Sequence, residues 1–411
     1  MIPLTLVEVR ALSLGAIEGD GDVITGVHVD SRRVRPGDLF VAVSGGEAYL
    51  ADARARGAAA TLVPDDPHAA LAALGSAVRA RSEAGVVAIT GSVGKTSTKD
   101  ILAALLRPRL RTVAAPDGFN NEIGLPLTLC LIEPETEVVV TEMAMRAAGQ
   151  IRDLARIARP QTGVITSIAP VHLENLGSLE NIARAKAELL EELPTDAVAI
   201  LPDGVPELEP FVPSGLDVRR FAPPEAEIRD GRTHVRWHGR DVVFGFAARH
   251  QAANAAAALT AAEALGVEAP REPVEVAFSR WRSQEAELPG GGLLINDAWN
   301  ANPVAMRAAL AHLLERANGR RSVAILGDMA ELGHDARRYH REIGEDAAAI
   351  DVVLGVGDLA RDYDPDEWVA SAAEAVDVAL GLVRAGDAIL VKGSRSVGLE
   401  VVADALLGAA A

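Results

Sequence analysis

The chain has 411 residues, and this length predicts two or three domains. Hydrophobic residues make up 49 % and charged residues 24 %, which are globular values and exclude a disordered chain. Lys and Arg number 40 against 58 Asp and Glu, so the net charge is −18. Such a surface repels nucleic acids and anionic membranes. We therefore expect no nucleic-acid partner, and any bound phosphate must lie in a local pocket.

Three further features bear on where the protein works. Cys130 is the one cysteine, so no internal disulfide can form, which fits a reducing compartment. Residues 1–20 lack the basic start and apolar core of a signal peptide. No uninterrupted run of about 18 apolar residues is present to cross a bilayer. We expect a cytoplasmic protein without membrane insertion.

The first block, residues 1–83, is predicted to be a small α/β N-terminal domain. Short β-type runs separated by turn signals indicate strands, and a longer Ala-rich segment indicates a helix. In chain order the pattern predicts strands at 23–29 and 39–43, a helix at 48–60 and a strand at 61–63.

The second block, residues 84–267, is predicted to be a central domain with a parallel sheet. Continuous apolar runs alternate with helical patterns, which is typical of a sheet buried on both faces. The predicted strand–helix pairs are 86–90 with 96–106, 138–142 with 149–158, and 164–168 with 178–192. Short strands between 216 and 246 then indicate a hairpin with its turn at 237–240, and a helix at 250–265 closes the block.

The third block, residues 268–411, is predicted to be a C-terminal Rossmann-like α/β domain. Its predicted strands are 293–296, 322–326, 351–355 and 388–392, and its helices start near Pro303, Asp335, Ser371 and Ser396. The fold class is therefore three-domain α/β, with a central P-loop mononucleotide-binding sheet between a small N-terminal domain and a second open sheet.

A glycine-rich segment between the strand at 86–90 and the helix at 96–106 predicts a nucleotide site. It comprises Gly91, Ser92, Val93, Gly94, Lys95, Thr96 and Ser97. The glycines let backbone N–H groups turn toward a phosphate, and the helix N-terminus favours negative charge. Lys95 can reach the outer phosphates, and the Thr96 hydroxyl can ligate Mg²⁺. Ile89 replaces the first glycine of the usual motif, and the alternative is a tight turn with an incidental lysine.

Further motifs make the chain resemble the ATP-dependent Mur ligase family over almost its whole length. They are Asp30-Ser31-Arg32, Phe119 to Pro126, Glu142-Met143, His172-Leu173-Glu174, Ala185 to Glu188, Arg249-His250, Asp297 to Pro303, Gly327 to Gly333 and Lys392 to Arg395. The Asn-Ala-Asn-Pro and Gly-Asp-Met-Ala-Glu-Leu-Gly pieces resemble the branch that adds D-alanyl-D-alanine to UDP-N-acetylmuramoyl-tripeptide. The resemblance implies an ATP-dependent peptide ligase of peptidoglycan synthesis that works through an acyl phosphate.

The resemblance also implies catalytic and metal-binding roles. Lys95, Lys186 and His172 are the implied catalytic residues, and the implied ligands of two Mg²⁺ ions are Thr96, Glu142, His172 and Lys186. For Lys186 it implies a carbamate, formed when the neutral amine reacts with CO₂. Taken alone, Glu142 could be a solvated strand-end residue, His172 a loop residue, and Lys186 a lysine on a charged helical surface.

Further residues are implied to hold ATP and the two substrates. The implied nucleotide contacts beyond the loop are Asn254, Arg282, Asp297, Asn300 and Asn302. The implied substrate contacts are Ser31 and Arg32 for the uridine end, Asn120 and Asn121 in the central cleft, and Lys392 and Arg395 for the carboxylate of the second substrate. The open alternatives are helix capping for the Asn and Asp residues, packing on Trp281 for Arg282, and a polar turn at Ser31-Arg32.

One segment departs from the family, and two other functions stay possible. Residues 47–50 replace an Asp-Gly-His segment and shorten the chain there, which leaves uridine-sugar binding undefined. The first rival is a sibling ligase of MurE-like, folylpolyglutamate or cyanophycin type. The second is a catalytically silent nucleotide-binding homologue, and a P-loop hydrolase switch lacks an Asp-rich second motif. We expect a monomer that acts on small-molecule substrates.

Overall fold

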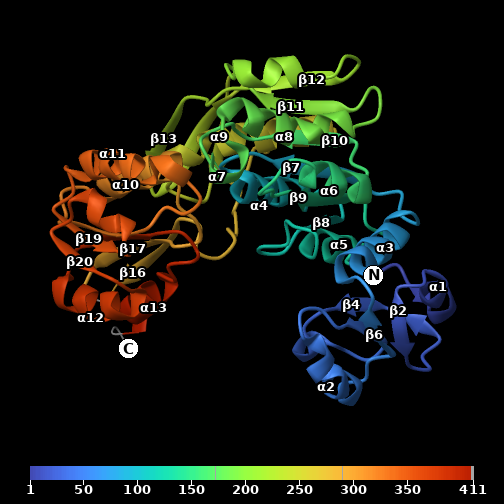
Figure 1. The fold of residues 1–411 in the computed structure, drawn as a ribbon. Coiled ribbons are helices and arrows are strands. Elements are labelled where there is room, and N and C mark those ends of the chain that lie inside the picture. The colour runs from blue at the N-terminus through green and yellow to red at the C-terminus, as the bar shows by residue number, and fades with distance from the viewer. Residues whose placement is uncertain (172, 289, 409–411) are drawn as a thin grey trace.

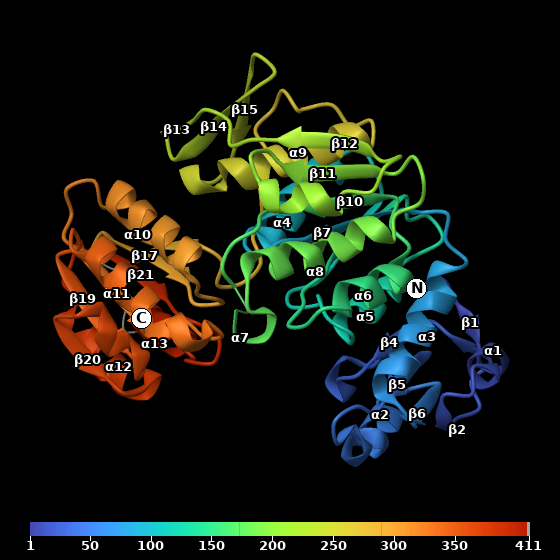
Figure 2. The ribbon, with the colours of Figure 1, turned by 45° about the horizontal axis from the view of Figure 1, so that its top comes forward.

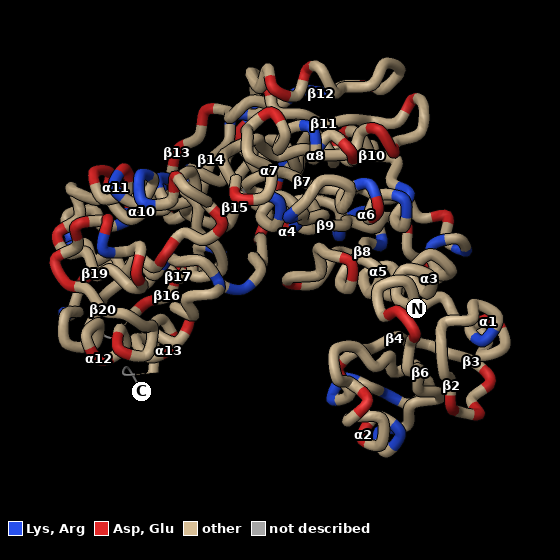
Figure 3. The backbone as a smooth tube through the Cα atoms, in the orientation of Figure 1, with Lys and Arg blue, Asp and Glu red and all other residues tan. Residues whose placement is uncertain are grey.

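The computed structural model describes residues 1–171, 173–288 and 290–408. Three α/β parts follow one another along the chain, and Figures 1 and 2 show the N-terminal and C-terminal parts attached to the central part and apart from each other. No helix in these described ranges is both long and apolar enough to cross a bilayer. Figure 3 shows acidic and basic residues interspersed over all three parts.

The N-terminal part contains a four-stranded sheet of order β2-β6-β5-β4, in which β2 alone runs antiparallel to its neighbour. Its elements are β1 (Leu4–Thr5), α1 (Leu6–Ala11), β2 (Gly15–Glu18), β3 (Val23–Ile24), β4 (Gly26–His28), β5 (Asp38–Val41), α2 (Leu50–Ala55) and β6 (Ala60–Pro64). The helix predicted at 48–60 is shorter than expected. Gly57 follows it with a φ of +94°, a left-handed conformation that ends helices.

Helix α3 (Pro67–Arg79) was not predicted, and it joins the first part to the second. Asp66 accepts hydrogen bonds from two N–H groups of its first turn, and Pro67 begins it, so the sequence did carry a start signal. Leu71 and Leu74 belong to the same apolar core as Leu125 of helix α5 (Gly124–Leu129). The N-terminal part is therefore packed on the central part through a shared core.

The central part is an all-parallel six-stranded sheet of order β12-β11-β10-β7-β9-β8. Its strands are β7 (Gly85–Thr90), β8 (Thr112–Ala114), β9 (Val138–Glu142), β10 (Thr162–Ile165), β11 (Val198–Pro202) and β12 (Asp217–Phe221). Its helices are α4 (Lys95–Leu106), α5, α6 (Gln150–Ala158), α7 (Leu173–Leu176), α8 (Leu179–Glu191) and α9 (Ala252–Ala264). The strand order reverses beside β7, and ligands of such sheets bind at that point.

A small antiparallel sheet follows, made of β13 (Ala226–Arg229), β14 (Arg232–Trp237) and β15 (Arg240–Phe244). The C-terminal part is a six-stranded sheet of order β16-β17-β21-β18-β19-β20, parallel except for β16. Its elements are β16 (Gln284–Leu288), β17 (Gly292–Asp297), α10 (Pro303–Ala317), β18 (Ser322–Gly327), α11 (Ala336–Ala347), β19 (Val352–Val356), β20 (Glu367–Val369), α12 (Ala372–Leu382), β21 (Ala388–Lys392) and α13 (Glu400–Gly408).

The predicted fold class is confirmed, with two displaced elements. Strand β10 begins at Thr162, two residues before the predicted start. Helix α13 begins at Glu400 and not near Ser396, and Gly398, with a φ of +80°, precedes it. The domain boundaries after residues 83 and 267 stay predictions.

Candidate functional site

The phosphate loop lies at the end of β7, where two glycines hold the backbone against neighbouring elements. Gly91 and Gly94 have φ values of +147° and +86°. A Cβ atom at Gly91 would lie 2.0 Å from the Thr166 hydroxyl, and one at Gly94 would lie 2.1 Å from the Asn254 amide oxygen. Both positions therefore require glycine. Lys95 curls over the loop, and its Nζ donates to the Gly91 carbonyl at 2.8 Å.

Two residues that sequence reasoning missed hold this loop from the next strand. The Val93 N–H donates to Ser167 Oγ at 2.9 Å, and the Thr166 hydroxyl donates to the Val93 carbonyl at 2.6 Å. Thr166 and Ser167 directly follow β10, which pairs with β7. Their place at the carboxyl edge of a neighbouring parallel strand was the signal that could have revealed them.

Glu142 ends β9 beside the loop and is the buried carboxylate of the site, with 4 % of its surface exposed. Its two oxygens accept hydrogen bonds from the Thr96 hydroxyl and from the Asn120 amide, each at 2.9 Å. A buried carboxylate oxygen beside a hydroxyl oxygen is a donor set that suits Mg²⁺, which commonly takes only one or two protein carboxylates. Among the described residues no group of three His, Cys, Asp or Glu gathers as a complete metal cage.

Lys186 of α8 is buried with 1 % exposure, so the surface alternative for this residue is wrong. Burial, with a smaller contribution from the Lys95 ammonium, lowers the pKa of Lys186 well below its usual value. Burial also lowers the pKa of Lys95, against the attraction of Glu142. The site therefore contains a lysine whose amine favours its neutral form. His172, the other predicted catalytic residue of this region, lies outside the described residues.

A cavity of about 700 Å³ joins the central and C-terminal parts at this loop. Its lining includes most predicted site residues: Ser92, Val93, Gly94, Lys95, Thr96, Ser97, Asn120, Asn121, Glu142, Asn254, Arg282, Asp297, Asn300, Asn302, Lys392 and Arg395. Ser31 and Arg32 lie elsewhere, in a short 3₁₀ turn of the N-terminal part, where Arg32 forms an ion pair with Asp30 at 2.8 Å. The structure thus brings the predicted ATP contacts of two sheets to one cleft.

On the C-terminal wall of the cleft, Lys392 is committed to the loop after β17. Its Nζ lies 2.5 Å from Asp297 Oδ2 and donates to the Asn300 carbonyl at 2.9 Å. The other carboxylate oxygen of Asp297 accepts the Ser283 N–H at 3.0 Å. One buried ion pair therefore holds the ends of β17 and β21 and the predicted nucleotide loop together.

Asn302 and Asn121 both perform the capping role that was their alternative. Asn302 Oδ1 accepts the Ala305 N–H at 2.9 Å at the start of α10. Asn121 Oδ1 accepts the Gly124 N–H at 2.9 Å at the start of α5. Both side chains also line the cleft, so capping leaves their predicted ligand roles open.

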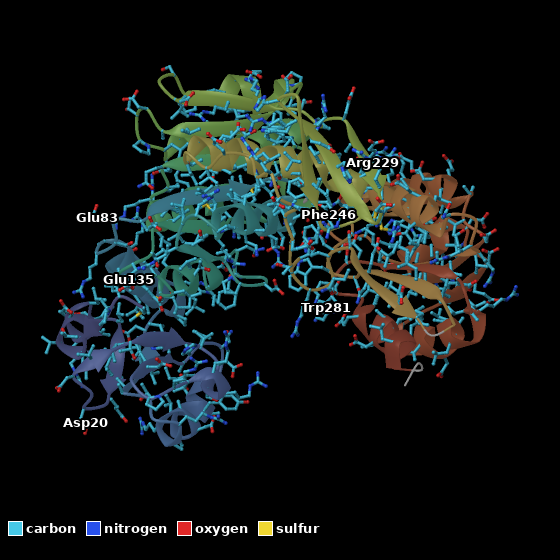
Figure 4. All side chains as sticks on the ribbon, turned by 180° about the vertical axis from the view of Figure 1, so that it is seen from behind. Asp20, Glu83, Glu135, Arg229, Phe246 and Trp281 are labelled. Carbon is cyan, nitrogen blue, oxygen red and sulfur yellow. The ribbon has the colours of Figure 1, made fainter. Side chains whose placement is uncertain are left out.

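Aromatic rings and guanidinium groups line the junction between the two parts. The rings of Trp281 and Trp299 are stacked with centroids 5.9 Å apart. Arg282 lies over Trp299 at 5.4 Å and not over Trp281, and Arg395 lies over Trp281 at 4.6 Å. Figure 4 shows Trp281 where the central and C-terminal parts meet. The expected packing of Arg282 on its neighbour Trp281 is therefore replaced by packing across the loop.

A buried histidine pair also joins the two parts. The rings of His250, before α9, and His312, on α10, meet edge to face with centroids 5.0 Å apart. Burial lowers the pKa of His250 to about 4, and the neighbouring His312 adds to the effect. Glu285 lies 3.1 Å from His312. Sequence analysis noticed Arg249-His250 only as a motif and did not predict this contact.

Comparison with known proteins agrees with this geometry. Residues 89–262 match the model of the Mur ligase middle domain, and residues 281–395 match that of the Mur ligase glutamate ligase domain. The UDP-N-acetylmuramoyl-tripeptide--D-alanyl-D-alanine ligase of Mycobacterium bovis is 35 % identical, with 99 % of this chain and 98 % of that protein covered.

Solved structures of the same branch share the fold over the full length. MurF from Acinetobacter baumannii superposes with a TM-score of 0.85 at 27 % identity, covering 99 % of each chain. MurF from Thermotoga maritima, solved in complex with ADP, gives a TM-score of 0.78 at 27 % identity over 93 % of this chain and 97 % of that one. The chain belongs to the Mur ligase family, among relatives that carry the name MurF.

Proposed function

We propose that the protein joins D-alanyl-D-alanine to the terminal carboxylate of UDP-N-acetylmuramoyl-tripeptide at the expense of ATP. The carboxylate takes the γ-phosphoryl group to form an acyl phosphate and ADP. The dipeptide amine then attacks the acyl carbon, a proton leaves the nitrogen, and inorganic phosphate departs. The observation that carries this proposal is one cleft that holds Lys95, Thr96 and Glu142 on one wall and Arg282 and the loop after β17 on the other.

The two walls divide the work of phosphoryl transfer, in which catalysis is mainly positioning and charge stabilisation. Lys95 moves from the Gly91 carbonyl to the outer phosphates when ATP enters the loop. Arg282 approaches from the opposite wall, where its guanidinium neutralises charge that develops on the phosphoryl oxygens. Because the walls belong to different sheets, closure of the cleft around ATP completes the site and excludes water.

Thr96 and Glu142 are the described residues that fit a magnesium ion bridging the phosphates. The bound metal supplies charge neutralisation for the transferring phosphoryl group. Asn120 holds the second oxygen of Glu142, so it orients that carboxylate. We propose two Mg²⁺ ions, with Lys186 and His172 contributing to the second.

Lys186 would contribute as a carbamate. Its neutral amine attacks CO₂, a C–N bond forms, and one proton is released, so a buried cation becomes an anion that suits a metal. The 1 % exposure and lowered pKa of this lysine support the reaction at neutral pH. Protein incubated with ¹³C-bicarbonate should show one carbamate signal, and Lys186→Ala should remove it. Lys99 is the matched control, because it is equally buried but paired with Asp100, and Lys99→Ala should keep the signal.

The substrate contacts remain proposals of different strength. Asn120 and Asn121 lie in the cleft, where the acceptor's carboxylate must meet ATP. Arg395 is the better ligand for the dipeptide carboxylate, because Lys392 already holds Asp297. Ser31 and Arg32 would hold the uridine end on the N-terminal part. We further propose that one chain suffices as a monomer, and that it acts in the cytoplasm, where ATP and the nucleotide-sugar acceptor are found.

An ADP-release assay tests the function directly. Purified protein should release ADP only when ATP, Mg²⁺, UDP-muramoyl-tripeptide and D-alanyl-D-alanine are all present. Replacing the acceptor by UDP-muramoyl-dipeptide with a diamino acid, or by folate with glutamate, tests the sibling activities. Release with one of those pairs alone would reassign the substrate, and no acceptor-dependent release at all would support the silent homologue.

A further inference from the structure

Behind the cleft, the segment that connects the central and C-terminal parts is fastened to the helix of the phosphate loop. The Ser279 N–H donates to Asp100 Oδ2 at 2.8 Å, and the Ser279 hydroxyl donates to Asp100 Oδ1 at 3.2 Å. Asp100 lies on α4, the helix that Lys95 begins. The Asp100 side chain is 8 % exposed and Ser279 is 9 % exposed, so water competes little with these bonds.

The fastening has a second and a third strand. Lys99 Nζ lies 2.7 Å from Asp100, and it donates to the Ala115 carbonyl at 2.9 Å and to the Ser279 hydroxyl at 3.3 Å. The Arg280 N–H donates to Asp117 Oδ2 at 3.0 Å. We call the contact of Asp100 with Ser279 the linker latch. It fixes the chain three residues before Arg282.

The residues around Arg282 are held in an unfavourable backbone conformation. Trp281 and Ser283 have φ values of +58° and +48°, a region that residues with a side chain seldom occupy. Such strain persists where the surroundings over-determine it, and it gathers at functional sites. Two anchors over-determine it here: the linker latch before Arg282, and the Ser283 N–H bonded to Asp297 after it. Releasing one anchor lets the strained segment relax and moves Arg282.

We infer that Asp100 is a positioning residue for the ligation, acting through the linker latch to set the guanidinium of Arg282 against the triphosphate. The inference rests on the proposed function for its catalytic consequence, but its binding consequence needs only ATP in the phosphate loop. Asp100 itself does not line the cleft, so it reaches the nucleotide only through the linker. The helix that receives the phosphates and the arginine that meets them from the other wall are thereby one mechanical unit.

A double-mutant cycle between Asp100→Ala and Arg282→Ala tests this coupling. Asp100→Ala should weaken binding of a non-hydrolysable ATP analogue, measured by calorimetry, and lower kcat by about tenfold, as small misplacements of a catalytic group do. In the Arg282→Ala background the same substitution should change both quantities by less than about twofold, because the group it positions is gone. Equal effects in both backgrounds, or an Asp100→Ala protein with wild-type binding and kcat, would overturn the inference.

The chain offers a matched control for loss of stability. Asp351 accepts the N–H of Ser322 at 2.7 Å and its hydroxyl at 2.8 Å, at the amino end of β18 and away from the cleft. Asp351→Ala should lower the unfolding temperature but leave analogue binding and kcat unchanged. If Asp100→Ala does not fold, Ser279→Ala keeps the N–H bond and should give a smaller loss with the same dependence on Arg282. Wild-type protein without acceptor-dependent ADP release would refute the proposed function, while the calorimetric cycle would still decide the latch.

Discussion

Removing one partner of the buried pair between Asp297 and Lys392 should destabilise the C-terminal part strongly. The charged groups are 2.5 Å apart, and the side chains are 14 % and 2 % exposed. At that distance the attraction is about 7 kcal/mol for an effective dielectric constant of about 20, most of which offsets the cost of desolvation. Asp297→Ala leaves the Lys392 ammonium buried with the Asn300 carbonyl, and such a loss costs about 3–5 kcal/mol.

Scanning calorimetry measures this loss as a fall of about 10–20 °C in the transition of the C-terminal part. The double variant Asp297→Ala/Lys392→Met removes both charges, and it should recover to within about 2 kcal/mol of the wild type. Its KM for ATP should stay raised, because the loop after β17 has lost its tether. A fall of less than about 1 kcal/mol in the single variant, or a double variant no more stable than the single one, would refute this reasoning.

Three further predictions concern the metal, the buried lysine and the histidine pair. Glu142→Gln keeps the shape of the side chain but loses its charge, so ADP release should fall by at least about 100-fold and need more Mg²⁺; unchanged Mg²⁺ dependence would count against the metal role. Lys186→Met should abolish activity yet raise the unfolding temperature at neutral pH, because the folded state holds this amine at a lowered pKa and binds fewer protons than the unfolded chain; a lower unfolding temperature would contradict this. The pKa of His250 is lowered to about 4, so between pH 6.5 and 4 the unfolded chain takes up a proton that the folded protein refuses, and unfolding free energy should drop by about 3 kcal/mol as pH falls through that range. His250→Gln should flatten this part of the stability profile, and an identical profile would show that His250 is not responsible.

The sequence by itself determined the elements with strong local signals. The apolar run of β9 was predicted with its observed bounds, and the start of α10 was marked by Asn302 and Pro303. Two glycines and a lysine after β7 predicted a phosphate loop, because glycine conformation and a strand–helix change are properties of a short stretch of chain. The shorter α2 and the unpredicted α3 show the limit of this reading, since turn chemistry and packing on a neighbouring part decide where such helices lie.

Only the tertiary structure decided which of the polar residues are buried and what they contact. Thr96 meets Glu142 across 46 residues of chain, and Ser279 meets Asp100 across 179. Lys186 reads as a surface lysine in its own helix, but packing leaves it 1 % exposed, and this burial lowers its pKa. Lys392 holds the loop after β17 because parallel pairing of β17 and β21 brings the two strand ends together. Contacts of this kind depend on how the sheets pack and on the low dielectric of the interior, and neither property is local in the chain.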